Sequence, residues 1–193
     1  MKNLTKTLLI ALTISLAFAC KQNDQHEGNE EHMNHTEEMD HENHDSMDHG
    51  SNSESTASVS FEDKQVSEAV NAYLGLKDAL VETDGEKAKN AAVELLSILG
   101  NSSFEGKSEM EIEVKKIAET TDTDAQRVSF DLVSNQMIQL VKSSVVTEGK
   151  LYKQYCPMAK NNEGAFWLSV SNEIRNPYFG DKMLKCGSVQ EEI

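Results

Sequence analysis

The residues with the most chemical character in this sequence lie in one acidic run near its N-terminus. All six histidines fall between His26 and His49, and three of the eight methionines lie among them. Each of these methionines stands two residues before a histidine, in residues 33–35, 39–41 and 47–49. A thioether is a soft, uncharged ligand that favours Cu(I) or Ag(I), whereas imidazole binds zinc, nickel and copper alike. The pattern predicts a copper or silver site, with zinc less favoured, whose ligands are His32, Met33, His35, Met39, His41, His44, Met47 and His49.

The alternative for this histidine–methionine run (residues 32–49) is a polar low-complexity spacer that binds nothing. Methionine does not improve solubility, and its repeated placement two residues before histidine favours metal binding over a spacer. Because imidazole coordinates a metal only when it is neutral, we expect the affinity of the run to weaken below about pH 6.5.

A second group of sulfur atoms lies near the C-terminus. Cys156 is followed closely by Met158, and Cys186 is preceded closely by Met183. One alternative is a disulfide, which in a loop of this length would stabilise the fold by roughly 3–4 kcal/mol. A second is an all-sulfur site for Cu(I), in which two thiolates and two thioethers converge. The third is a pair of free buried thiols, with both methionines as apolar filler. The disulfide and the metal site could also interconvert with redox state.

Residues 1–19 have the pattern of an export signal. Lys2 and Lys6 precede an apolar run that is shorter than the roughly 20 residues a membrane-spanning helix needs. The run ends in small residues and then Cys20, the arrangement expected when a lipoprotein signal is cleaved before a lipid-accepting cysteine. The alternative is an ordinary secretory signal that is cut nearby. Two or more acyl chains on Cys20 would anchor the protein stably to a membrane, so we expect a lipoprotein of the cell envelope that faces the periplasm.

The charge of the chain limits its partners. The formal net charge is −15 and the isoelectric point is about 4.7, which argues against nucleic acid and against anionic lipid surfaces, and favours cations. No histidine follows His49, so histidine-activated nucleophiles are excluded from the remainder of the chain. The chain also lacks a glycine-rich phosphate loop. We therefore predict that the protein is not an enzyme.

The composition divides the chain at Val59. Residues 20–58 contain no aromatic residue and no Val, Ile or Leu, which predicts a disordered tether because such a segment cannot bury enough apolar surface to order its backbone. Residues 59–149 contain no proline and show helical periodicity, which predicts an all-α fold, an up-and-down four-helix bundle. The apolar positions of the four expected helices span residues 61–81, 88–99, 112–118 and 128–145, and the second helix is expected to end at Gly100. Their predicted N-terminal capping boxes are Ser60 with Asp63, Thr83 with Glu86, Ser108 with Glu111 and Thr123 with Gln126.

Residues 150–193 break this pattern and form a predicted irregular C-terminal cap of the same domain. The segment holds both prolines and the only tryptophan. Residues 165–170 are aromatic and β-branched enough to predict a single strand. We expect the aromatic side chains to pack the cap onto the helices, namely Phe166, Trp167, Tyr178 and Phe179.

Several short blocks of this last segment are distinctive: Tyr-Cys-Pro-Met-Ala at 155–159, Trp-Leu-Ser at 167–169, and Asn-Pro-Tyr-Phe-Gly at 176–180 leading to Cys-Gly at 186–187. They resemble an uncharacterised helical domain of Gram-negative periplasmic lipoproteins, which is also found fused to periplasmic adaptor subunits of copper/silver efflux pumps. The resemblance covers roughly residues 61–193 and leaves the tether outside. It implies a role in handling heavy-metal cations outside the cytoplasm, but it brings no assigned activity or ligand set.

Two functional hypotheses follow from the sequence. In the first, a lipid-anchored protein binds copper or silver and acts in metal buffering, sensing or delivery to an efflux adaptor. In the second, a disulfide-stapled domain is an interaction module that docks an efflux adaptor or another envelope protein, with the tether only a spacer.

Overall fold

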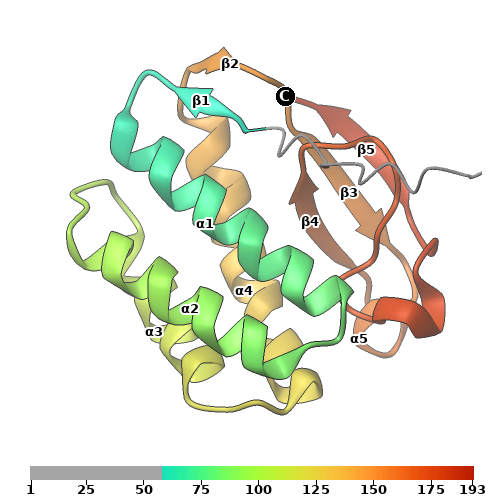
Figure 1. Ribbon diagram of the computed structural model, residues 1–193. Coiled ribbons are helices and arrows are strands. Elements are labelled where there is room, and N and C mark those ends of the chain that lie inside the picture. Colours follow the sequence, from blue (N-terminus) through green and yellow to red (C-terminus); the bar gives the residue numbers. More distant parts are fainter. Residues whose placement is uncertain (1–57) are drawn as a thin grey trace, which may run out of the picture. The chain divides into compact units, whose positions relative to one another are not determined.

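The computed structural model describes residues 58–193 (Figure 1). A short strand, β1 (Ser60–Phe61), is followed by four helices: α1 (Lys64–Val81), α2 (Gly85–Gly100), α3 (Lys107–Ala118) and α4 (Thr123–Lys142). Each helix packs against the next one in the chain, and α1 also contacts α4. All four helices were predicted, because their apolar residues recur at the spacing that places them on one helix face. Their buried side chains form one continuous core.

Aspartates, rather than the predicted hydroxyl residues, begin three of these helices. The carboxylate of Asp63 accepts a hydrogen bond from the backbone of Gln65, and Asp84 and Asp122 cap α2 and α4 in the same way. Helix α3 begins after Gly106 without any side-chain cap. The predicted capping boxes are therefore wrong. Aspartate caps as well as serine or threonine does, so a nearby hydroxyl residue does not identify the first helical residue.

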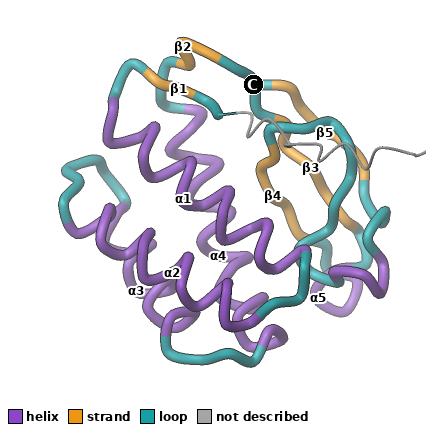
Figure 2. The backbone as a smooth tube through the Cα atoms, in the orientation of Figure 1, coloured by secondary structure: helices purple, strands orange, loops and turns teal. Residues whose placement is uncertain are grey.

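The C-terminal segment is a sheet and not an irregular cap, so the prediction of an all-α fold is wrong there. Strands β3 (Tyr152–Cys156), β4 (Ala165–Ser169) and β5 (Ser188–Glu192) form an antiparallel sheet in the order β4-β3-β5. A separate two-stranded ladder pairs β1 (Ser60–Phe61) with β2 (Val146–Glu148). The described part of the chain is thus mostly helical with antiparallel strands (Figure 2).

Only β4 was predicted among the strands, and the reason lies in the side chains. Every residue of β5 is exposed, so its hydrophobicity does not alternate as that of a half-buried strand does. Strand β3 buries the polar side chain of Gln154, which also breaks an alternating pattern. Both strands therefore depend on the backbone hydrogen bonds of their neighbours, which a single sequence does not reveal.

The sheet is attached to the helices through buried aromatic side chains, as predicted for Trp167 and Tyr178. Phe166 and Phe179 are only partly buried, and the ring of Phe166 packs on Tyr155 within the sheet. Trp167 of β4 is fully buried, and its ring meets the ring of Tyr178 edge-on at 6.1 Å. The ring of Tyr73 in α1 stacks on Phe130 of α4 at 5.4 Å. The hydroxyl of Tyr73 also accepts a hydrogen bond from the backbone of Leu168 in β4, at 3.1 Å. These contacts join α1, α4 and β4 around one core.

Two short elements complete the described residues: α5 (Ala159–Asn162) between β3 and β4, and the 3-10 helix η1 (Gly180–Met183) before β5. No helix in residues 58–193 has the length and apolar character needed to cross a membrane.

Candidate functional site

The structure brings Cys156 and Cys186 together. Cys156 is the last residue of β3, and the antiparallel register pairs Tyr155 of β3 with Ser188 of β5. Because Cys186 stands two residues before Ser188, this register places it beside Cys156. The two Sγ atoms lie 2.8 Å apart and are not joined by a disulfide. Cys156 is completely buried, whereas Cys186 is partly exposed.

Asn176 holds the segment that carries Cys186. This asparagine is completely buried, and its side-chain amide donates a hydrogen bond of 2.8 Å to the carbonyl oxygen of Cys186. Its backbone amide donates to the carbonyl of Leu184, and its side-chain oxygen accepts from the backbone of Tyr178. The backbone amide of Cys186 in turn donates to Met183 at 3.0 Å. One buried side chain thus fixes the path of the chain into the thiol pair (Cys156 and Cys186).

Gly187 allows this approach because it has no side chain. Its φ is +140°, a conformation that favours glycine. A Cβ atom at this position would lie 2.8 Å from the carbonyl oxygen of Tyr155 and 2.9 Å from the indole ring of Trp167. A larger residue would therefore push β5 and Cys186 away from β3.

The environment of Cys186 favours its protonated form. The hydrogen bond with Cys156, followed by burial, raises the pKa of the Cys186 thiol to about 11, and the backbone amide of Met158 opposes that shift. The thiol is therefore protonated at neutral pH. A metal ion that binds here must displace a proton, so binding would strengthen as pH rises.

The two methionines differ in their relation to the thiol pair. Met158 follows Cys156 by two residues and its backbone amide faces the sulfur of Cys186, while its side chain is 46% exposed. Met183 ends η1, three residues before Cys186, and is partly buried. No group of three or more His, Cys, Asp or Glu side chains converges anywhere in residues 58–193. Among these four residue types in residues 58–193, a metal site at the thiol pair would therefore have only the two cysteines as ligands, and any further soft ligand would be a thioether.

Sequence reasoning missed the role of Arg127, which fastens the C-terminal segment to the helices. The side chain is 7% exposed, and its Nε donates to the carbonyl of Pro177 at 2.9 Å. Its Nη2 donates to the carbonyl of Leu80 at the end of α1, at 3.1 Å. The available signal was a charged residue between apolar positions of a predicted helix, because such a residue stays buried only when it is paired.

The remaining predicted site residues lie outside the described part of the chain. They are the lipidation residue Cys20 and the predicted metal ligands of the histidine–methionine run: His32, Met33, His35, Met39, His41, His44, Met47 and His49.

Comparison with known proteins finds a similarity to a family model over part of the chain. Residues 69–149 match the model of a family described as a protein of unknown function (DUF3347). The matched range begins within α1 and ends just after β2, so it includes neither Cys156 nor Cys186. The predicted presence of an uncharacterised domain is confirmed for this range. No curated protein and no solved structure matches the chain.

Proposed function

We propose that this protein binds copper or silver ions outside the cytoplasm and is anchored to a membrane through a lipid on Cys20. The observation that carries the proposal is the thiol pair, in which two unbridged sulfur atoms lie 2.8 Å apart with a methionine within three residues of each. Soft sulfur ligands of this kind suit monovalent coinage metals. The histidine–methionine run would supply a second set of ligands, which are imidazole and thioether groups.

The two sets of ligands would have different roles. The histidine–methionine run would capture an ion with few ligands and release it readily, while the thiol pair would hold an ion more tightly after losing protons. Transfer between them is ligand exchange and needs no bond to be made or broken in a substrate. Buffering, sensing or delivery to an efflux adaptor would all use this exchange, and the resemblance to domains fused to efflux adaptors favours delivery.

The test is the number of Ag(I) ions retained by the full-length protein. We expect Cys156→Ser with Cys186→Ser to abolish one class of bound ion, and Met33→Leu, Met39→Leu and Met47→Leu together to weaken the other. Met110→Leu is the matched control, because Met110 is buried in α3 and belongs to neither group of ligands, and leucine has a similar volume. The proposal would be refuted if the unchanged protein, the two ligand variants and the Met110→Leu control all retained the same number of Ag(I) ions.

The close approach of the two sulfur atoms also favours the second hypothesis, a disulfide-stapled interaction module. A disulfide requires the Sγ atoms to approach to about 2.05 Å. Thiol titration of the isolated protein without reductant separates the two functions. In the lipidated protein, whose Cys20 has no free thiol, two reactive thiols after denaturation support metal binding, whereas no reactive thiol together with no retained Ag(I) supports the interaction module.

A further inference from the structure

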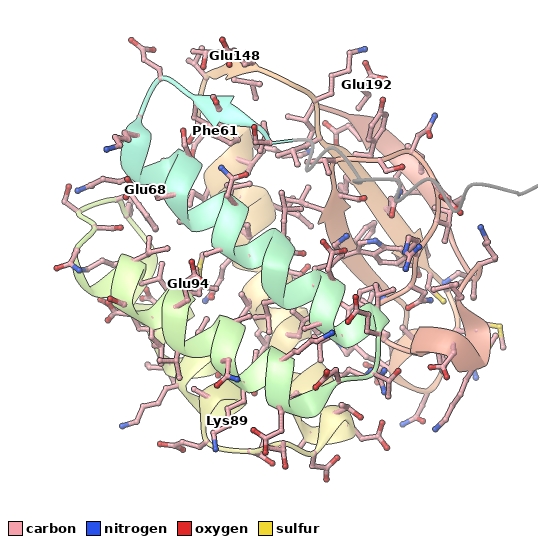
Figure 3. All side chains as sticks on the ribbon, in the orientation of Figure 1. Phe61, Glu68, Lys89, Glu94, Glu148 and Glu192 are labelled. Atoms are coloured by element: carbon pink, nitrogen blue, oxygen red, sulfur yellow. The ribbon has the colours of Figure 1, made fainter. Side chains whose placement is uncertain are left out.

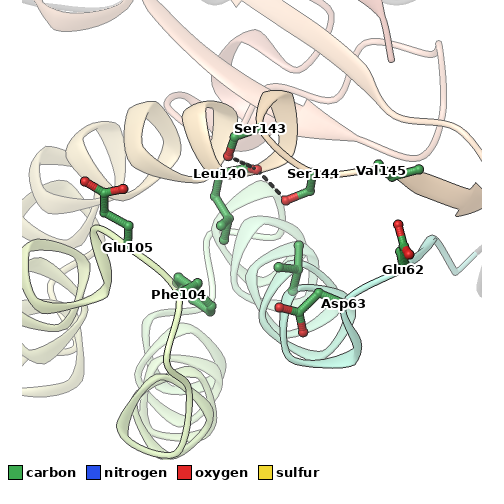
Figure 4. Close-up of a pocket in the computed structure, with 9 residues that line it drawn as sticks. Glu62, Asp63, Phe104, Glu105, Leu140, Ser143, Ser144 and Val145 are labelled. Atoms are coloured by element: carbon green, nitrogen blue, oxygen red, sulfur yellow. Dashed lines mark hydrogen bonds between the residues drawn. The ribbon is translucent and has the colours of Figure 1, made fainter.

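A groove crosses the surface where α1 begins and α4 ends (Figure 4). It has a volume of about 520 Å³, and the loop between α2 and α3 forms its other side. A second hollow of about 460 Å³ continues between α3 and α4, and both are lined by Glu105, Leu140 and Ser143. The two hollows therefore form one acidic groove, which is large enough for several side chains.

The floor of the acidic groove is apolar. Leu140 and Phe104 point into it in Figure 4, and Val66 lines it at the start of α1. Val145, which follows α4, is 60% exposed at its edge. Apolar surface of this kind gains free energy when a partner covers it.

The rim carries only negative charge. Glu62, Asp63, Glu105 and Glu109 line the groove, and no lysine or arginine does. None of these four carboxylates belongs to an ion pair among residues 58–193. The nearby Lys107 donates instead to the carbonyl oxygens of Leu99 and Ser102. The rim is therefore not neutralised by the domain itself.

One further feature adds an acceptor. The side-chain oxygen of Gln136, which lines the second hollow, is buried and accepts no hydrogen bond. It favours a ligand that brings hydrogen-bond donors.

We propose that the acidic groove binds a cationic, amphipathic segment of a partner polypeptide. Lysine or arginine side chains of the segment would meet Glu62, Glu105 and Glu109, while its apolar side chains would cover Leu140 and Val145. A bare metal ion does not fit, because no three acidic side chains of residues 58–193 converge. The acidic rim also excludes nucleic acid. This interaction goes beyond metal binding, since it uses none of the sulfur ligands.

The probe is a fluorescent peptide of about 18 residues, or five helical turns, with lysines on one face and leucines on the other. Binding to the full-length protein is followed by fluorescence anisotropy. We expect Glu105→Gln with Glu109→Gln to weaken binding about three- to tenfold, the size expected for two exposed charge interactions. Val145→Ser should weaken binding without changing the charge of the protein.

Two controls separate the groove from general attraction to an acidic protein. Glu86→Gln with Glu94→Gln removes the same charge from exposed positions on α2, which do not line the groove, and Figure 3 labels Glu94 there. A second peptide has the same composition with its leucines scattered. We expect the control protein to bind normally and the scattered peptide to bind more weakly. Equal losses in both double variants, equal binding of both peptides, or no binding at all would overturn the proposal.

Discussion

The position of Cys186 is set by two residues that are not ligands for soft metals. Asn176 holds its carbonyl group, and Gly187 leaves space for the close contact with β3. The sulfur atoms were recognisable from the sequence as candidates, but their distance depends on these two neighbours. In the sequence, Asn176 stood out only as the first residue of the distinctive block at 176–180. Its buried hydrogen bonds could not be foreseen, because they join residues up to ten positions apart.

At this scale we predict slow alkylation of Cys186. Its pKa of about 11 lies about two units above an ordinary thiol, so at pH 8 it should hold roughly 100-fold less thiolate. The higher intrinsic nucleophilicity of such a thiolate recovers part of the loss, which leaves a rate about tenfold slower than that of a free cysteine. The measurement is the rate at which iodoacetamide alkylates Cys186 between pH 7 and pH 11. It is made on the intact protein and on the Cys156→Ser variant. Replacing Cys156 by serine should lower the midpoint if the Cys156 thiol is the cause, because the serine hydroxyl does not ionise and donates a stronger hydrogen bond to the Cys186 thiolate.

The raised pKa of Cys186 also makes the free energy of unfolding depend on pH. The folded protein holds the Cys186 proton more tightly than the unfolded chain does, so this contribution is present below the ordinary thiol pKa and is lost as pH rises toward about 11. In the alkylation experiment, a rate profile with its midpoint near pH 8.5–9 in both the intact protein and the Cys156→Ser variant would contradict the raised pKa of Cys186.

At the scale of elements, Arg127 joins α4 to the end of α1 and to the turn before η1. We predict that Arg127→Met lowers the free energy of unfolding by about 2–4 kcal/mol, because two buried carbonyl groups lose their donors while the apolar volume is kept. The measurement is urea denaturation. Arg175→Met is the matched control, since Arg175 is exposed and forms no ion pair among residues 58–193, and it should change stability by less than about 0.5 kcal/mol.

The Arg127 variant should also expose the thiol pair, because the turn at Pro177 leads into the segment that carries Cys186. Faster labelling of Cys186 by a maleimide would confirm that Arg127 acts on the thiol pair through this segment. A destabilised protein with unchanged labelling would limit Arg127 to a role within the helices.

Elements differ in how far the sequence predicts them. The four long helices could be predicted, since their apolar periodicity is local. Strands β3 and β5 could not, because β5 is exposed throughout and β3 buries the polar side chain of Gln154. The amide of Gln154 donates to the carbonyl groups of Ser171 and Glu173, so its burial makes sense only once the loop after β4 is in place.

For the whole molecule we predict that a disulfide and a metal ion compete for the thiol pair. An external disulfide such as oxidised glutathione would take up two electrons and two protons and join Cys156 to Cys186. Oxidation should raise the free energy of unfolding by roughly 3–4 kcal/mol, because the crosslink restricts the unfolded chain. It should also reduce Ag(I) retention to the level of the Cys156→Ser, Cys186→Ser protein. Unchanged retention after complete oxidation would place the bound ions elsewhere.

The sequence by itself determined the mostly helical character of residues 64–142, the acidic composition, and which residues are candidate ligands for soft metals. These properties depend on composition and on the spacing of residues within one element. Only the tertiary structure decided that Cys156 and Cys186 meet and that unpaired carboxylates surround an apolar groove. Both results depend on strand pairing and helix packing between segments far apart in the chain, and no local pattern encodes which of those segments become neighbours.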